Sequence, residues 1–215
     1  GSITSTVSAN QTAGFLVVTW TCPASGSWTI GHGLGVKPAM IICKDRDGAA
    51  NWPVWHKSLT NETTYCLQLS TTAAQFVNAA YWNSTAPTST LLSFGSSGGF
   101  NASNDAVAYC FAEIPGYSKF GSYVGNGSAD GPFVYCGFRP KYMLVKCSSA
   151  GGVGYDWGVV DTARDTYNNT QYALRPNTAE TEGTVGTIYV QPLSNGFKIS
   201  GTSTPVNNSG STYIF

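Results

Sequence analysis

The chain has 215 residues, of which 42% are apolar, enough for a substantial core, while only 10% are charged. Because average soluble domains carry about 25% charged residues, the surface must consist largely of Ser, Thr, Asn and Gly. Eleven basic residues balance eleven acidic ones, and no basic patch or long apolar run stands out, which argues against partners such as nucleic acid or a membrane.

The first fourteen residues (1–14) are rich in Ser, Thr, Asn and Gln, which predicts an N-terminal arm or linker. A β-branched and aromatic run at Gly14–Trp20 then predicts a strand. Asn51–Leu59 predicts a further strand, in which Pro53 indicates a sheet edge or a bulge. Thr71–Trp82 is the one segment whose pattern favours a short helix.

One proline-led strand occurs twice, as VKPAMIICK (Val36–Lys44) and as FRPKYMLVK (Phe138–Lys146), a shift of 102 residues (140 − 38). Between each proline and lysine lies an apolar run too short for an ordinary helix, which is typical of a buried strand. Segments that follow the two copies also match, including Trp52 with Trp157. The pattern predicts an internal duplication of about 100 residues per unit.

Many short strands, glycine-rich turns and little helix predict an all-β fold of tandem, jelly-roll-like β-sandwich units. The expected boundaries are 15–116 for unit 1 and 117–215 for unit 2. A single merged sandwich with two-fold pseudosymmetry is the alternative. The repeat sets Phe215 near Ala108, so unit 2 stops where unit 1 continues as YCFAEIPGY. Either the chain is a trimmed segment, which is the favoured interpretation, or a neighbouring subunit supplies the strand.

Six cysteines lie mostly inside apolar runs, where a thiol behaves as a small hydrophobe, so free thiols are expected rather than disulfides. No C-x-x-C pair exists, which argues against structural zinc. The loops DRDG (Asp45–Gly48) and NGSADG (Asn126–Gly131) resemble the start of a calcium loop, but Gly137 stands where the second would need its glutamate. We therefore expect no metal and no cofactor.

Candidate catalytic groups do not form a recognisable set. The two histidines, His32 and His56, lack a nucleophile in a recognisable setting, and GSSGG (Gly95–Gly99) matches the nucleophile elbow only by chance, because no helix follows it. The carboxylate pairs, Asp45 with Asp47 and Asp156 with Asp161, do not recur between the repeats as a shared site would. No enzyme activity is expected.

Four aromatic residues are the candidates for contact with a glycan or a protein partner: Trp28, Tyr81, Trp82 and Trp55. Trp28 and Trp82 have no counterpart in the other repeat, and Trp55 enlarges a position that holds Val160 in the second copy. Core packing is the more frequent role of each such side chain, and exposed stacking is the functional alternative.

The strings IGHGLGVKPAMIICKDR, NWPVWHKSL, WNSTAPTS, AYCFAEIPGYSKFGSYVGNGSADGPFVYCGFRPKYMLVK and SNGFKIS resemble an uncharacterised repeat domain of tailed-phage virion proteins, usually described as tail-fibre-like. The resemblance covers nearly the whole chain after about residue 14. The resemblance implies a structural role. The family offers no catalytic motif that could be assigned to residues of this chain.

These observations favour a non-enzymatic virion structural protein, a module of a phage fibre, tail or head appendage on the outer surface of the virion. Its expected partners are copies of itself, as a homo-oligomer, and other virion proteins. The alternative is a lectin-like module for host attachment, whose loops Gly95–Asn104 and Tyr81–Thr88 would contact host surface glycans. A polysaccharide depolymerase is a third, weaker hypothesis because paired catalytic groups are lacking.

Overall fold

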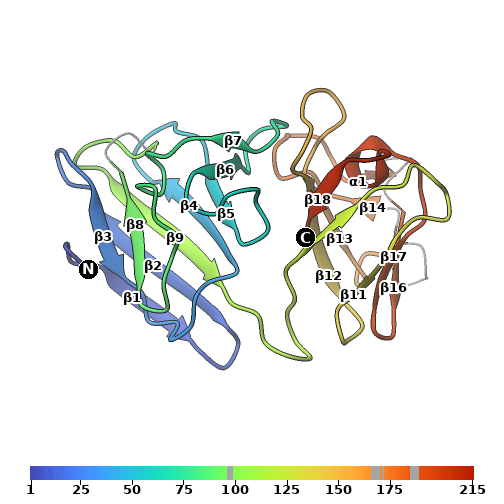
Figure 1. Ribbon diagram of the computed structural model, residues 1–215, viewed down its shortest axis with the longest axis horizontal. Helices are drawn as coiled ribbons and strands as arrows, with labels where there is room; N and C mark the ends of the chain where they lie inside the picture. Colours follow the sequence, from blue (N-terminus) through green and yellow to red (C-terminus); the bar gives the residue numbers. More distant parts are fainter. Residues whose placement is uncertain (96–98, 166–169, 171, 185–188) are drawn as a thin grey trace. The chain divides into compact units, whose positions relative to one another are not determined.

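The computed structural model describes residues 1–95, 99–165, 170, 172–184 and 189–215 (Figure 1). The chain divides into two compact units, each with its own core: unit 1 comprises Gly1–Leu69 and Gln75–Ile114, and unit 2 comprises Ser70–Ala74 and Pro115–Phe215. Nearly all regular structure is antiparallel sheet, which confirms the all-β class. No helix among the described residues has the length and apolar character needed to cross a membrane.

Unit 1 is organised around a seven-stranded sheet in the order β1-β2-β9-β4-β5-β6-β7, with a separate pair β3-β8. Its strands are β1 (Thr6–Asn10), β2 (Phe15–Thr21), β3 (Trp28–Gly31), β4 (Met40–Asp45), β5 (Pro53–His56), β6 (Tyr65–Gln68), β7 (Phe76–Val77), β8 (Leu91–Phe94) and β9 (Asp105–Phe111). Strand β9 pairs with β2 on one side and with β4 on the other, so it is central to the sheet.

The core of unit 1 follows from the two-residue period of its strands. Along β2 the buried positions alternate, so that Leu16, Val18 and Trp20 face one side. The ring of Trp20 stacks on Phe94 of β8, with 4.9 Å between centroids, and this contact joins the β3-β8 pair to the main sheet.

Unit 2 contains a sheet in the order β10-β18-β12-β13, a sheet β11-β17-β16 and a pair β14-β15. Its elements are β10 (Ser122–Val124), β11 (Phe133–Tyr135), β12 (Tyr142–Cys147), β13 (Gly158–Asp161), β14 (Tyr172–Ala173), β15 (Gly183–Thr184), β16 (Val190–Leu193), β17 (Gly196–Ile199), α1 (Thr204–Asn207) and β18 (Thr212–Ile214). A bridge between Val159 and Leu174 connects β13 to the end of β14.

The two units share one strand order. In unit 1 it is β2-β9-β4-β5-β6, and in unit 2 the corresponding run is β10-β18-β12-β13-β14. The registers agree as well, because Lys44 pairs with Val107 and Lys146 pairs with Ile214. Phe215 therefore occupies the place of Ala108, as the sequence alignment predicts. A common topology is what an internal repeat requires, and duplication of one ancestral unit remains a prediction.

Three local predictions are wrong. Residues 1–14 are not simply an arm, because Thr6–Asn10 forms the edge strand β1 against β2. Pro53 lies in β5, between β4 and β6, where it is tolerated as the first residue of the strand. Thr71–Trp82 forms no helix, since Ser70–Ala74 belongs to unit 2 while Phe76–Val77 pairs with β6 in unit 1.

Candidate functional site

The aromatic residues predicted to contact a ligand all lie in the core. The exposed fractions of Trp55, Trp82, Trp28 and Tyr81 are 0%, 2%, 4% and 6%. Trp28 stacks on Phe94 at 5.9 Å. The Trp55 indole donates a hydrogen bond to the backbone oxygen of Glu62 at 2.7 Å. The prediction of exposed stacking is therefore wrong for these four residues, because folding already uses their ring surfaces.

The loop predictions for glycan contact have different outcomes. The loop Gly95–Asn104 includes residues 96–98, so that part of it, and with it the centre of the GSSGG match, lies outside the described residues. The other loop begins at Tyr81 and Trp82, which turn inward, and Asn83 and Ser84 follow with φ of 48° and 50°. Both of these residues are exposed, in contrast to the buried Tyr81 and Trp82 before them.

Both histidines have structural roles. His32 is 6% exposed, its Nε2 lies 3.2 Å from the backbone oxygen of Thr88, and burial lowers its pKa. His56 is fully buried in β5, where its Nδ1 accepts the backbone N–H of Ser58 at 3.1 Å. Neither ring is therefore presented to solvent as a catalytic base.

The cysteine prediction is confirmed, since all six are free and buried. Burial raises the pKa of the Cys22 thiol to about 11 and that of Cys66 to about 12, so both are held as thiols. Among the described residues no group of three or more His, Cys, Asp or Glu side chains is placed to hold a metal.

The buried carboxylate of Asp45 organises two loops of unit 1. It accepts the backbone N–H groups of Asp47 and Gly48 at 3.1 and 2.9 Å, and that of Asn101 at 2.9 Å. The side-chain amides of Asn101 and Asn104 donate to it at 2.9 to 3.0 Å. Burial alone would raise the pKa of Asp45, but these hydrogen bonds outweigh it and lower the pKa. The carboxylate is structural because its lone pairs are occupied.

The repeated lysines hold the backbone after their strands. Lys44 donates to the backbone oxygens of Gly48 and Ala50, both at 2.8 Å. Lys146 donates to the backbone oxygen of Tyr155 at 2.8 Å and to that of Thr72 at 3.2 Å. Lys146 is fully buried, and desolvation lowers its pKa to about 8. The two lysines at corresponding positions thus share a structural role and do not mark a reactive group.

The buried ammonium of Lys146 makes the stability of unit 2 depend on pH. The folded pKa of Lys146 is about 8 and its reference value is 10.5. At a pH between these two values the unfolded chain keeps the proton on Lys146, whereas the folded chain loses it. We expect the free energy of unfolding of the wild type, relative to Lys146→Met, to rise by about 3 kcal/mol as pH increases through this window. Urea unfolding of both proteins across this pH range measures it, and a constant difference would contradict the assignment.

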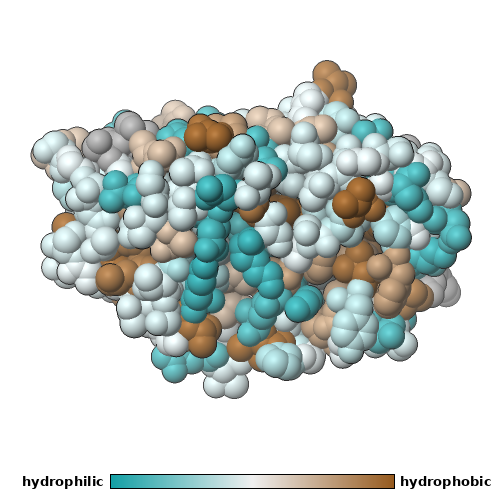
Figure 2. Space-filling model, viewed as in Figure 1, coloured by the Kyte–Doolittle hydropathy of each residue, from teal (hydrophilic) through white to brown (hydrophobic). Residues whose placement is uncertain are grey.

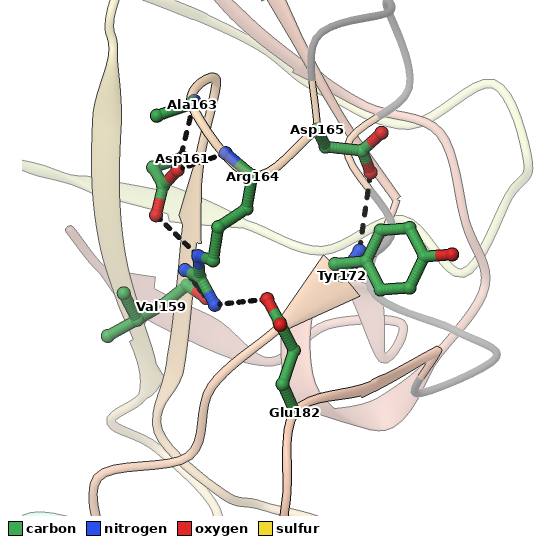
Figure 3. Close-up of polar contacts among 7 residues, drawn as sticks. All are labelled: Val159, Asp161, Ala163, Arg164, Asp165, Tyr172 and Glu182. Atoms are coloured by element: carbon green, nitrogen blue, oxygen red, sulfur yellow. Dashed lines mark hydrogen bonds and ion pairs between the residues drawn. The ribbon is translucent and has the colours of Figure 1, made fainter.

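A charged cluster follows β13 in unit 2 (Figure 3). Nε of Arg164 lies 2.6 Å from the carboxylate of Asp161, and its terminal nitrogens lie 3.1 Å from Glu182 and 3.3 Å from the backbone oxygen of Val159. Asp161 also accepts the backbone N–H groups of Arg164 and Ala163, and its pKa is lowered, chiefly by the first of these. Because the opposite charges are paired with one another, the cluster fixes the turn and offers no unpaired carboxylate for acid–base chemistry.

One open cleft of about 360 Å³ lies in unit 1, between the N-terminal residues and β2. Serine and threonine side chains from 4–6 and 19–21 line it, together with Arg46 and Asp105. The carboxylate of Asp105 accepts a hydrogen bond from the Thr21 hydroxyl at 2.8 Å. Trp20 also borders the cleft but is only 4% exposed, so its ring offers little surface for stacking.

Exposed apolar side chains are concentrated in unit 2. Of the eleven large hydrophobic residues exposed in the described part of the chain, three lie in unit 1: Val7, Val36 and Val77. Eight lie in unit 2: Tyr117, Val124, Phe133, Tyr135, Tyr142, Val153, Tyr172 and Leu174. Figure 2 shows one face of the molecule, where hydrophobic residues lie in several separate places on a mostly pale surface, with strongly hydrophilic residues between them.

Strand β11 shows how the pattern exposes them. Its burial alternates so that Val134 enters the core while Phe133 and Tyr135 point outward, 47% and 65% exposed. Sequence reasoning missed this surface, since VYCGF looks like a buried apolar run. All three residues of Phe133–Tyr135 are apolar, so the sequence carries no polar–apolar alternation that would indicate which of them is exposed.

Fold and burial together describe an all-β protein of two units, each with its own hydrophobic core, in which most of the exposed large hydrophobic residues belong to the second unit. The chain matches the family model described as "Domain of unknown function (DUF7483)" over residues 1–215, and it belongs to that family. No curated protein and no solved structure matched the chain.

Proposed function

We propose that the protein is a non-enzymatic structural module that assembles through unit 2 with copies of itself and with other proteins of a virion. The observation that carries this proposal is the concentration of exposed apolar side chains in unit 2, eight against three. Aromatic residues are enriched at the centres of protein interfaces, and four of the eight are tyrosines.

The low charge supports the same proposal. Only 10% of the residues are charged, so long-range electrostatic attraction contributes little to association. Contacts would instead rely on apolar burial and on backbone hydrogen bonds, and each fully buried large apolar side chain contributes about 1.5 to 3 kcal/mol. Placement in a phage fibre, tail or head appendage rests on the sequence resemblance and is part of the proposal.

Replacing one exposed tyrosine should separate association from folding. We expect the wild type to sediment as a concentration-dependent oligomer and Tyr135→Asp to sediment as a monomer, because the carboxylate would be desolvated in the interface. Val77→Asp is the matched control, since Val77 is 61% exposed on unit 1, and should keep the oligomer. Sedimentation velocity measures both, and circular dichroism confirms folding. A wild type that stays monomeric at every concentration would contradict the proposal. Equal effects of Tyr135→Asp and Val77→Asp on the oligomeric state would also contradict it.

A lectin-like function is the second candidate, and the cleft beside Arg46 and Asp105 is the observation that favours it. Hydroxyl, guanidinium and carboxylate groups can hydrogen-bond sugar hydroxyls. The support is weaker than for assembly because Trp28, Tyr81, Trp82 and Trp55 are buried and cannot stack on a sugar ring.

A further inference from the structure

The cleft of unit 1 lies at one end of the seven-stranded sheet, on the face turned away from the core. Thr6 of β1 pairs with Thr19 of β2, and Thr21 pairs with Asp105 of β9. Residues directly opposite each other in an antiparallel pair project to the same face, as do residues two apart in one strand. Trp20, between Thr19 and Thr21, projects the other way into the core. The four polar side chains therefore share the outer face of the sheet.

Arg46 continues this polar row on the neighbouring strand. It follows the last residue of β4, and its backbone N–H donates to the backbone oxygen of Asp105 at 2.7 Å. Because Asp45 is opposite Ala106, the register sets Arg46 opposite Asp105. The Arg46 side chain is exposed and lines the cleft. Its guanidinium has no hydrogen-bond or ion-pair partner in the part of the chain that the structure describes.

The two nearest carboxylates are engaged elsewhere. Asp105 accepts the hydroxyl of Thr21 at 2.8 Å, and Asp47 accepts the backbone N–H of Asp105 at 2.6 Å. Neither of them forms an ion pair with Arg46 within the described residues. The positive charge of Arg46 can therefore pair with an anion that enters the cleft, while Asp105 keeps lone pairs that can accept a further hydroxyl.

Hydroxyl groups form the rest of the polar lining. The hydroxyl of Ser5 donates to the backbone oxygen of Gly31 at 2.9 Å. Those of Thr4, Thr6 and Thr19 make no hydrogen bond to any described residue. Each such hydroxyl can both donate and accept, so this wall is suited to a ligand that itself carries several hydroxyl groups.

Two features narrow the class of ligand. Trp20 is the one aromatic residue in the described lining and is only 4% exposed, so ring stacking contributes little and a charged contact gains importance. Arg46 is the one basic residue in that lining, whereas a polyanion such as nucleic acid needs several. The volume of about 360 Å³ lies within the roughly 300 to 1,000 Å³ typical of small-molecule sites.

We propose that this cleft binds an acidic saccharide, with the carboxylate of one sugar residue on Arg46 and its ring hydroxyls on the threonines and Asp105. A planar guanidinium can hold a carboxylate through two parallel hydrogen bonds. The inference rests on the second candidate function, the lectin-like one, and names the chemical class of its ligand. It is independent of assembly because the cleft lies in unit 1.

Isothermal titration calorimetry of the 215-residue chain tests the charge requirement. The probes are trigalacturonate, trimannuronate and sialyllactose, each compared with its own methyl ester, which keeps the ring hydroxyls and removes the negative charge. At least one acid should bind at least about tenfold more tightly than its ester. The difference should shrink as the salt concentration rises, because the ion pair is accessible to solvent.

Variants of Arg46 test the location of the site. Arg46→Gln should bind the acid no more tightly than the ester, and Arg46→Lys should fall between this variant and the wild type because it keeps the charge and loses the fork geometry. Arg139→Gln is the matched control, since Arg139 is an exposed arginine of unit 2, and it should bind as the wild type does. Circular dichroism confirms that each variant is folded.

The possible failures can be told apart. Equal affinity of the wild type for acid and ester would reject the inference and leave the lectin-like candidate standing. Absence of binding by all of these compounds would overturn both. A preference for the acid that survives in Arg46→Gln, or that is lost equally in Arg139→Gln, would set the ligand outside the cleft and overturn the inference. Sedimentation of Tyr135→Asp reports separately on assembly through unit 2.

Discussion

Asp45→Ala should lower the free energy of unfolding of unit 1 by about 3 to 5 kcal/mol, because it leaves buried donors without an acceptor. Asp45 is fully buried and accepts hydrogen bonds from Asp47, Gly48, Asn101 and Asn104. The substitution therefore frees both loops that meet at the end of β4. Urea unfolding followed by tryptophan fluorescence measures the change.

Two further variants define the origin of this effect. Asp130→Ala removes an exposed carboxylate that pairs with Lys198 and should leave stability unchanged. Asp45→Asn keeps the shape of the side chain but places an amide N–H group against the donating amide of Asn104. Its free energy of unfolding should therefore fall between those of the wild type and Asp45→Ala. A change no larger for Asp45→Ala than for Asp130→Ala would contradict the structural role.

The pH dependence of this contribution has a definite sign. Because the folded pKa of Asp45 lies below its reference value of 3.8, its stabilising contribution is present above that value. It is lost as pH falls through the lower folded pKa. Asp45→Asn should lack this acid-dependent component, while the other carboxylates of the chain still titrate in both proteins.

Trp82→Ala should lower the free energy of unfolding by about 3 to 5 kcal/mol, as expected for a large side chain removed from a core. Trp82 is 2% exposed, and its ring lies 6.0 Å from Phe94 and 6.3 Å from Tyr81. Trp82→Phe should cost much less, because the buried indole N–H has no hydrogen-bond partner in the described structure. Thermal unfolding of both variants distinguishes them, and a fully stable Trp82→Ala with reduced glycan binding would restore the ligand-contact hypothesis.

The all-β class could be predicted from the sequence because it depends on local chain properties. Short apolar runs, turns and the proline-led strand indicate β units, and the alignment that sets Phe215 against Ala108 agrees with the register of both sheets. The free cysteines followed from the same local reasoning, since thiols inside apolar strands pack as hydrophobes.

The polar and aromatic sites could not be predicted in the same way, because they depend on contacts between distant residues. The Asp45 carboxylate meets Asn101 and Asn104, which are 56 and 59 residues away in the chain. Tyr81 and Trp82 lie in a turn outside any strand, so no period indicated which way their rings point. The exposure of Phe133 and Tyr135 depends on the face that β11 turns to the core.

Cryo-electron microscopy of the native assembly, at a resolution that traces side chains, tests the proposed structural role most directly. The account predicts that Phe133, Tyr135 and Tyr142 of unit 2 are buried against other polypeptides. It is contradicted if these three side chains face solvent in the assembly while the cleft beside Arg46 and Asp105 holds a bound glycan.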